Sequence, residues 1–312
     1  MLSVVIPIYN EVNIEPNIRR VIGVLDTAGI EHEIILVDDG SKNSVWEEIT
    51  QIVNTYKNIT GVAFSRNFGK ESALCAGLDH AQGDCAVCLD SDMQFPPEVI
   101  PEMYSLWEQG YEVVEGVKSK RQNEGLAYKL CSNIFYSVLK RLSDIDLKNG
   151  SDFRLLDRAA IEAWKKLPEK QTFFRGMSSW VGFKRIKFEF DVADRVEGDS
   201  KWSLRRLMNL AIDAVTSYTA APLYAASIFG VVFLLFALVL GVQTLLRYIV
   251  GSAQGGFTTV ILLQLFIGSV MLICLGVIGI YIKKIYEEVK GRPRYIVSRV
   301  IKSPESDSGG KS

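Results

Sequence analysis

Two long apolar segments without a charged residue occupy the last third of this 312-residue chain, at residues 223–246 and 260–282. Each exceeds the roughly 20 residues that an α-helix needs to cross a hydrocarbon core. A core helix of a soluble protein would rarely be so long without a charge. We therefore predict a transmembrane hairpin within residues 220–290.

Basic residues predict the orientation of this hairpin. The linker at 247–259 carries one cation, Arg247, whereas five basic residues follow the second segment: Lys283, Lys284, Lys290, Arg292 and Arg294. Because cytoplasmic flanks are rich in Lys and Arg, we expect an integral protein of the inner or plasma membrane with two spans. The catalytic part, both termini and a tail over residues 291–312 would be cytoplasmic. Ala226 and Gly230 have the spacing of close helix contacts, which makes a homo-oligomer plausible.

Composition excludes some other functions. A formal net charge of -1 and a pI near 6.2 argue against nucleic acid as a partner. The five cysteines include a Cys85–Cys88 pair, but no second pair would complete a zinc site. In a strand, residues three apart face opposite sides, so we interpret the cysteines as reduced packing residues.

Short apolar runs alternate with helical stretches through residues 1–202. The expected strands are residues 3–8, 33–37, 61–64, 85–89 and 111–117. The expected helices are residues 12–28, 44–56 and 72–81, and another that opens at Pro96 and Pro97. This alternation predicts βαβ units, and hence an α/β, Rossmann-like domain with a mostly parallel sheet.

Polar motifs follow four of these strands, at residues 9–11, 38–41, 66–71 and 90–92. Since ligands bind beyond the carboxyl ends of parallel strands, we expect the motifs to share one edge of the sheet. Acidic groups there could accept hydrogen bonds from a ribose or base, and Lys70 could meet a phosphate. Each motif alone is also ordinary turn chemistry. GxGxxG and GxxxxGK[ST] do not occur, which disfavours a classical dinucleotide site and a P-loop.

Asp90 and Asp92 are the motif with the clearest chemistry. Residues i and i+2 of an extended segment point the same way, so both carboxylates can face one spot. Alone, the pair could be a solvated acidic turn. A cation between them would relieve their repulsion, and Mg²⁺ is commonly held by one or two carboxylates and the phosphates of a substrate.

Two amphipathic segments flank the predicted membrane part. Residues 126–142 place apolar side chains at helical spacing with basic residues off the stripe, and residues 203–219 form a second such segment. Either a membrane-interface helix or a helix packed on the domain core fits residues 126–142. Arg195, Ser200 and Lys201 lie in a polar loop between these segments. Their charges suit a phosphate-rich reaction, although a solvated surface loop has the same composition.

Taken together, the motifs resemble family-2 glycosyltransferases of the GT-A type. The resemblance is to the polyprenyl-phosphate branch, which includes bactoprenol glucosyltransferases and dolichyl-phosphate-mannose synthases. It covers nearly the whole chain and is carried by residues 4–11, 38–41, 65–71, 90–98, 150–158 and 198–202, with the paired apolar segments.

This resemblance implies roles for individual residues. The nucleotide-sugar pocket would be lined by Pro7, Tyr9, Glu11, Asp38, Asp39, Lys70, Asp90, Ser91 and Asp92. Asp90, Asp92 and Gln94 would hold Mg²⁺ or Mn²⁺ on the diphosphate. Arg121, with Arg195, Ser200 and Lys201, would contact phosphate on the acceptor side. Ser91 departs from the Ala common in relatives, and no consequence is expected from so small a change.

Asp152 matches the presumed catalytic base of the resembling enzymes. A lipid phosphate has a second pKa of about 6, so it is mostly dianionic at pH 7 and needs little deprotonation. We therefore hypothesise that Asp152 mainly orients the acceptor or a sugar hydroxyl.

The expected function is inverting transfer of one sugar, with glucose from UDP-glucose favoured, to undecaprenyl phosphate at the cytoplasmic membrane face. Two alternatives stay open: a GDP-mannose-dependent polyprenyl-phosphate-mannose synthase, and a non-catalytic scaffold or flippase partner.

Overall fold

The computed structural model describes residues 1–118, 151–167, 174, 181–190, 215–216, 219–250 and 256–304. The chain forms two units. Unit 1 consists of Met1–Lys140, Ile145–Ser200 and Pro293–Ser312, and unit 2 of Arg141–Asp144 and Lys201–Arg292. Unit 2 is therefore mainly an insertion in the chain of unit 1.

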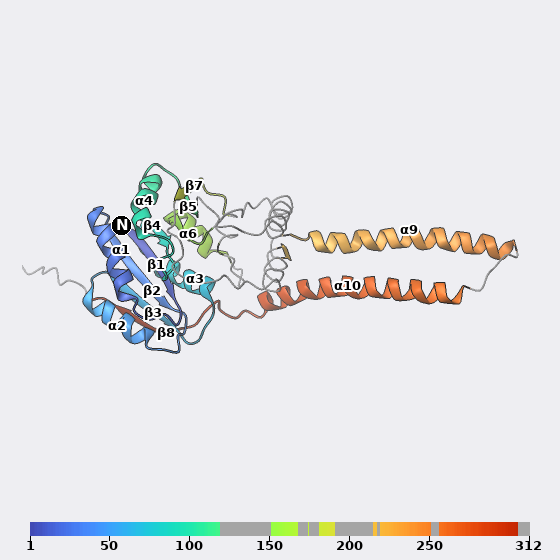
Figure 1. Ribbon diagram of the computed structural model, residues 1–312, viewed down its shortest axis with the longest axis horizontal. Helices are drawn as coiled ribbons and strands as arrows, with labels where there is room; N and C mark the ends of the chain where they lie inside the picture. Colours follow the sequence, from blue (N-terminus) through green and yellow to red (C-terminus); the bar gives the residue numbers. More distant parts are fainter. Residues whose placement is uncertain are drawn as a thin grey trace, which may run out of the picture. The chain divides into compact units, whose positions relative to one another are not determined.

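Unit 1 is built on a sheet whose described strands have the order β7-β5-β6-β4-β1-β2-β3-β8 (Figure 1). The strands are β1 (Leu2–Ile8), β2 (His32–Asp38), β3 (Ile59–Phe64), β4 (Cys85–Cys88), β5 (Val113–Lys118), β6 (Arg154–Asp157), β7 (Arg185–Phe190) and β8 (Val297–Lys302). Neighbours pair in parallel at β1–β2, β1–β4, β2–β3 and β5–β7. The pairs β3–β8, β4–β6 and β5–β6 are antiparallel. The predicted mostly parallel sheet is confirmed.

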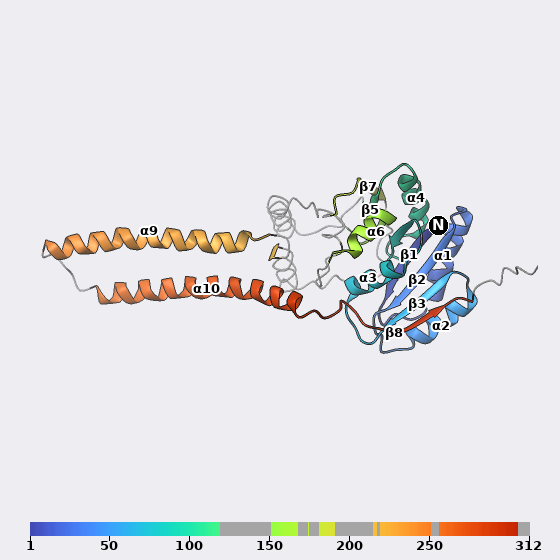
Figure 2. The ribbon, with the colours of Figure 1, turned by 180° about the vertical axis from the view of Figure 1, so that it is seen from behind.

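Helices cover both faces of this sheet, as the two opposite views show (Figures 1 and 2). On one face lie α1 (Glu15–Thr27), α2 (Val45–Thr55), the short η1 (Pro97–Val99) and α4 (Ile100–Glu108). On the other lie α3 (Lys70–His80) and α6 (Arg158–Lys165). Every residue of β1 is buried, because its alternating side chains enter a core on each side.

Cys85 and Cys88 belong to different cores, one on each face of the sheet. Both are free thiols, as are Cys75 and Cys274. The interpretation of these four cysteines as reduced is confirmed; Cys131 lies outside the described residues.

Strand β8 lies within the predicted tail over residues 291–312. It pairs with β3 from Thr60↔Lys302 to Phe64↔Val297. Just before it, Tyr295 stacks on Phe64 with 5.0 Å between ring centroids, and its hydroxyl donates to Asp79 at 2.5 Å. Without β8, the backbone groups along the outer edge of β3 would lack these partners, so a strand that covers this edge stabilises the sheet.

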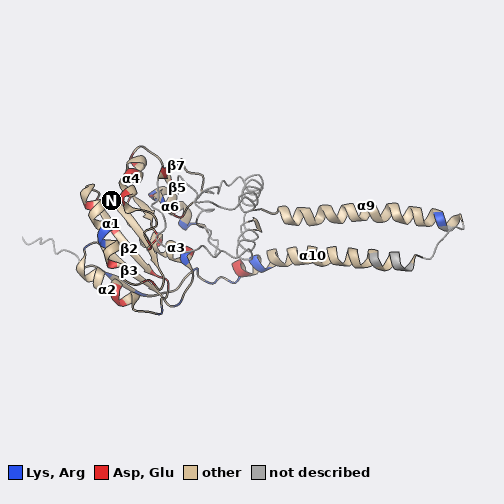
Figure 3. Ribbon diagram, viewed as in Figure 1, with Lys and Arg blue, Asp and Glu red and all other residues tan. Residues whose placement is uncertain are grey.

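Unit 2 is described mainly by two long helices, α9 (Ala221–Ile249) and α10 (Phe257–Val289). They contact each other, for example through Phe233 and Phe266, whose ring centroids are 5.5 Å apart. Charged residues lie only near helix ends (Figure 3). Both helices are long and apolar enough to cross a membrane. The amphipathic segment 126–142 and most of 203–219 lie outside the described residues.

Hydrogen exchange distinguishes a paired β8 from a free tail. We expect the amides of Ile301 and Ser303 in the detergent-solubilised protein to exchange far more slowly than unstructured peptide. Ser303 N–H donates to the Ile59 carbonyl at 2.9 Å, and Ile301 is the next residue of β8 whose amide faces β3 in this antiparallel ladder. Replacing Tyr295 with Ala should speed exchange in β8, since the stack on Phe64 and the bond to Asp79 are lost together. Random-coil exchange rates at residues 297–302 in the unmodified protein would contradict the pairing.

Candidate functional site

The site lies where β1 pairs with β2 on one side and with β4 on the other. The chain runs from β1 outward through β2 to β3 and then crosses back to β4, so the strand order reverses at this point. The β1–β4 ladder ends at Val5↔Cys88, after which Leu89 N–H donates to the Val5 carbonyl at 2.9 Å. Pro7, two residues later in β1, faces the same side and has no N–H to leave unpaired. The two strands can therefore diverge there without loss of a hydrogen bond.

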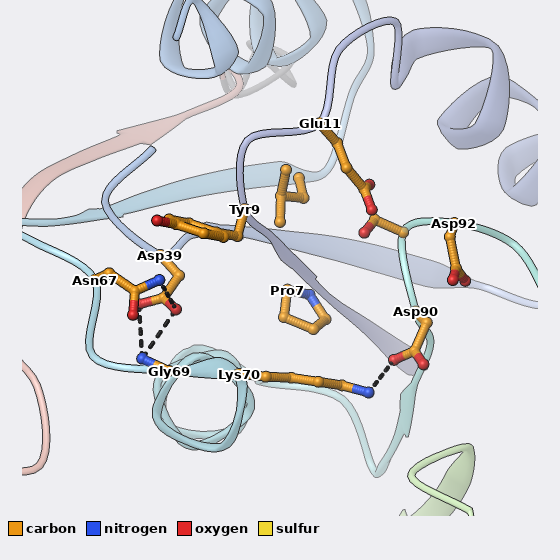
Figure 4. A pocket seen from close by; sticks show the side chains of 11 residues that line it. Pro7, Tyr9, Glu11, Asp39, Asn67, Gly69, Lys70, Asp90 and Asp92 are labelled. Carbon is orange, nitrogen blue, oxygen red and sulfur yellow. Dashed lines mark hydrogen bonds and ion pairs between the residues drawn. The ribbon is translucent and has the colours of Figure 1, made fainter. Parts of the chain in front are cut away.

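A pocket of about 300 Å³ opens at this edge of the sheet. Its walls come from the end of β1, the start of α3 and the segments that follow β1, β2, β3 and β4. The lining residues are Pro7, Ile8, Tyr9, Glu11, Asp39, Asn67, Gly69, Lys70, Asp90, Ser91 and Asp92 (Figure 4). The structure thus brings together the four motifs that the sequence placed at strand ends.

Asp90, Ser91 and Asp92 form a tight turn after β4. The Met93 amide donates to the Asp90 carbonyl at 3.2 Å, and Met93 has a positive φ of 49°. The Gln94 amide donates to the Asp92 carboxylate at 3.1 Å. From α1, the Asn17 side-chain amide donates to the Ser91 carbonyl at 3.1 Å. The direction of both carboxylates is therefore fixed by the backbone of the turn and by a neighbouring helix.

Lys70 joins this turn to Asp152. Its ammonium nitrogen lies 2.7 Å from Asp90 Oδ1 and 2.8 Å from Asp152 Oδ2. The register of β4 with β6 explains why both carboxylates reach Lys70. The antiparallel ladder ends at the pair Cys88↔Arg154, and Asp90 lies two residues after Cys88 while Asp152 lies two residues before Arg154. Burial would lower the pKa of Lys70, but the carboxylates of Asp152 and Asp90 outweigh it and raise that pKa. The lysine is therefore a permanent cation of the site.

Acidic groups around this lysine ionise less readily than usual. Burial raises the pKa of Asp90, the Lys70 ammonium opposes the shift, and the charges of Asp152 and Asp92 add to it. Burial likewise raises the pKa of Glu11; a hydrogen bond with Ser91 opposes this, and the charges of Asp92 and Asp90 reinforce it. A cation bound at this end of the pocket would therefore offset the excess of negative charge.

A buried ion pair supports the segment that carries Asp152. Glu115 in β5 and Arg154 in β6 are cross-strand partners, with Arg154 Nη1 at 3.2 Å from Glu115 Oε1. Arg154 Nε also donates to the Ser151 carbonyl at 3.0 Å. Because two fully buried charges need fixed partners, this pair holds the backbone next to Asp152 in one conformation.

The opposite end of the pocket is organised by Asp39. Its carboxylate accepts from the Phe68 amide at 2.7 Å, the Gly69 amide at 2.9 Å and the Asn67 side chain at 2.9 Å. Burial raises the pKa of Asp39, while the bonds from the Phe68 and Gly69 amides oppose that shift. Gly40 allows the close approach of the two loops: it has a φ of +65°, and a Cβ there would lie 2.2 Å from the Arg66 carbonyl carbon.

Asp38 is not a pocket residue. Its carboxylate accepts from the Ser41 amide at 2.9 Å, and only Asp39 of the two adjacent acids lines the cavity. Asp38 therefore stays a predicted nucleotide-pocket residue that does not line this cavity, because its side chain closes the turn that follows β2.

Tyr9 and Glu11 lie on a loop that is fixed from α2. The Glu48 carboxylate accepts from three successive amides, those of Asn13, Ile14 and Glu15, at 2.6–3.1 Å. This arrangement satisfies the unpaired N–H groups at the start of α1. It leaves Tyr9 half exposed at the pocket mouth, while Glu11 points toward the Asp90–Asp92 turn (Figure 4).

The predicted site residues differ in whether they line the pocket. Pro7, Tyr9, Glu11, Asp39, Lys70, Asp90, Ser91 and Asp92 line the pocket, and Asp152 adjoins it through Lys70. Gln94 is not a lining residue; its amide caps Asp92. Arg121, Arg195, Ser200 and Lys201 lie outside the described residues. Ile8, Asn67 and Gly69 were not predicted as lining residues, although Asn67 and Gly69 belong to a polar motif that follows β3.

Comparison with known proteins identifies the family. Residues 3–163 match the model of the glycosyl transferase family 2. The chain is 40% identical over 303 residues to an uncharacterized glycosyltransferase of Synechocystis sp., covering 95% of this chain and 94% of the relative. It is 35% identical over 304 residues to the prophage bactoprenol glucosyl transferase homolog of Escherichia coli, covering 96% and 99%.

A likeness to solved structures is weaker. Glucosyl-3-phosphoglycerate synthase from Mycobacterium tuberculosis, in complex with Mn²⁺, UDP and phosphoglyceric acid, is 20% identical with a TM-score of 0.48. The match covers 69% of this chain and 76% of that one.

The family match spans the pocket and both of its acidic ends, and the curated relatives match nearly the whole chain. This protein therefore belongs to glycosyl transferase family 2 and is a nucleotide-sugar glycosyltransferase.

Proposed function

We propose that this enzyme transfers a single sugar, with inversion, from a nucleoside diphosphate to the phosphate of a polyprenyl lipid. Undecaprenyl phosphate is the favoured acceptor and UDP-glucose the favoured donor. The observation that carries the proposal is the pocket at the β1–β4 divergence, with paired carboxylates at one end, in a chain that also has two helices able to cross a membrane. The bactoprenol glucosyl transferase name of a relative with almost full coverage supports the lipid acceptor.

The donor fits the pocket by its chemistry. Tyr9, Asp39 and Asn67 form an end suited to a nucleoside, because they combine an aromatic face with hydrogen-bonding groups. The acidic end would hold the diphosphate through a divalent cation. Pro7 lines the pocket between these two ends (Figure 4).

Asp90 and Asp92 would hold Mg²⁺ or Mn²⁺, with Gln94 nearby. In the part of the chain that the structure describes, no group of three His, Cys, Asp or Glu side chains is arranged to bind a metal alone. Two carboxylates completed by substrate phosphates are the donor set that Mg²⁺ favours, so the residues fit a cation that arrives with the nucleotide. Such a cation, when bound, stabilises the negative charge of the departing diphosphate.

On the acceptor side, Asp152 would orient rather than deprotonate. A lipid phosphate is mostly dianionic at neutral pH, with a second pKa of about 6. The Lys70 ammonium, 2.8 Å from Asp152 Oδ2, forms an ion pair with this carboxylate and holds it in place. Arg121, Arg195, Ser200 and Lys201 are proposed to bind the acceptor phosphate.

The membrane part would keep the site next to its lipid substrate. We propose that α9 and α10 span the bilayer, with unit 1 and both termini on the cytoplasmic side, since Lys283, Lys284, Lys290 and Arg292 follow the second span. The segments 126–142 and 203–219 are proposed to lie in the membrane interface.

Purified protein with a divalent cation, UDP-glucose and undecaprenyl phosphate should form a lipid-linked monosaccharide, detected by chromatography of radiolabelled lipid. UDP should raise the melting temperature more than GDP does, because the donor is a uridine nucleotide. Stronger protection by GDP, with product from GDP-mannose, would instead identify a polyprenyl-phosphate-mannose synthase. Failure with every nucleotide sugar would overturn the proposal.

Replacing Asp92 with Asn should lower turnover by about 10²–10³-fold, because one charge that serves the leaving diphosphate is lost. The melting temperature should stay unchanged, since Asp92 is at the surface of the turn and its bond to the Gln94 amide can be kept by the Asn oxygen. Asp26→Asn, at an exposed carboxylate near the end of α1, is the control and should keep full activity. Equal activity of both variants would contradict the proposed role of Asp92 in holding the metal.

Asp152→Asn tests the difference between an orienting group and a base. We expect kcat to fall by up to about 10²-fold through misplacement of the acceptor. The ratio of variant to unmodified rates should be constant between about pH 6.5 and pH 9, because the acceptor is already dianionic there. A variant that is inactive at neutral pH but regains activity at high pH would show that Asp152 is the base.

A further inference from the structure

Lys70 places an ammonium group at the acidic end of the pocket. Its ammonium contacts Asp90, a proposed metal ligand, on one side and Asp152 on the other (Figure 4 shows the Asp90 contact). The three side chains come from the start of α3, the turn after β4 and the segment before β6. Lys70 is 42% exposed, Asp90 26% and Asp152 10%, so the lysine is the most accessible member of the cluster.

The charge around Lys70 explains why it adopts this position. Asp90, Asp92 and Glu11 line the same end of the pocket, and Asp152 adjoins it. Without a nearby cation these carboxylates would repel one another at short range. The lysine therefore supplies the positive charge that keeps the acidic end folded in the form seen here.

A divalent cation bound by Asp90 would approach this ammonium closely, because both use the same carboxylate. Two cations at such a distance repel, and a long lysine side chain can move more easily than the turn that carries Asp90. The turn is held by Asn17 and by its own backbone bonds, so it offers little freedom to adjust.

We propose that Lys70 is an exchangeable counter-cation of the active site. It neutralises Asp90 and Asp152 before the donor binds, and it leaves Asp90 when a divalent cation is bound there. Its ammonium then stays with Asp152 and holds that carboxylate in position for the acceptor. This inference rests on the proposed function, and it assigns Lys70 a positioning role rather than direct contact with the donor phosphate.

The proposal predicts a gain of metal affinity when the lysine charge is removed. Mn²⁺ binding to the full-length protein in detergent, without nucleotide, is measured from the loss of the free Mn²⁺ signal in electron paramagnetic resonance. Lys70→Met should bind Mn²⁺ at least about tenfold more tightly than the unmodified protein, since a cation within contact distance of a ligand is lost. Lys70→Arg keeps the charge and should change the affinity by less than about threefold.

Lys57→Met is the matched control. Lys57 is an exposed residue just before β3, at the edge of the sheet opposite the pocket, so loss of its charge should leave Mn²⁺ affinity unchanged. Thermal unfolding identifies a variant that does not fold. If Lys70→Met does not fold, Lys70→Gln is used for the same comparison, with the same expected gain.

Unchanged or weaker Mn²⁺ binding by folded Lys70→Met or Lys70→Gln would overturn the proposal that a divalent cation replaces the Lys70 ammonium at Asp90. This outcome is distinct from failure of the proposed function, because the titration needs neither a sugar donor nor a lipid. Tight Mn²⁺ binding by Lys70→Met would support the exchange even if the unmodified protein formed no glycolipid from any donor. The second result would contradict only the proposed transferase reaction.

Discussion

The pairing of β1 with two parallel neighbours is the constraint on which the active site depends. Parallel strands end at the same edge, so hydrogen bonds made deep in the sheet decide which loops meet above it. Residues 9–11 and 90–92 are far apart in sequence, and the ladder from Leu2↔Cys85 to Val5↔Cys88 brings them together. Gly77 allows α3 to pack against this same strand, because a Cβ there would lie 2.1 Å from Val5 Cγ1. The packing of the core and the geometry of the site therefore depend on the same strand, β1.

Electrostatics is the second constraint, and it acts against folding. Burial raises the pKa of Asp39, Asp90 and Glu11, which means that their charged forms lose solvation in the folded protein. Asp39 recovers part of this loss through bonds from backbone amides, and Asp90 through Lys70. For Glu11 a hydrogen bond with Ser91 offsets part of the loss, while the charges of Asp92 and Asp90 add to it. A site that binds a cation with its substrate keeps such an imbalance, because full internal neutralisation would leave nothing for the ligand to contribute.

Local patterns were enough to predict the strands of the first half and the edge at which their loops gather. Continuous apolar runs such as residues 34–37 indicate buried parallel strands. The rule that ligands bind at the carboxyl ends of such strands then predicts which edge carries the site. The difference between Asp38 and Asp39 was beyond such patterns, since it depends on a turn in which Gly40 has a positive φ. The contact of Lys70 with Asp152 was also beyond them, because it spans 82 residues and depends on the register of β4 with β6.

Strand β8 shows a similar limit and has a consequence for the membrane part. Residues 297–302 are short, half polar and isolated beyond an apolar segment, so their sequence resembles a solvated tail. Their pairing with β3 is non-local, and only the structure reveals it. It means that the chain leaves unit 1 before α9 and returns to unit 1 after α10. A chain that starts and finishes in one folded domain must cross a bilayer an even number of times. The two spans proposed here satisfy that requirement, whereas a single span would not.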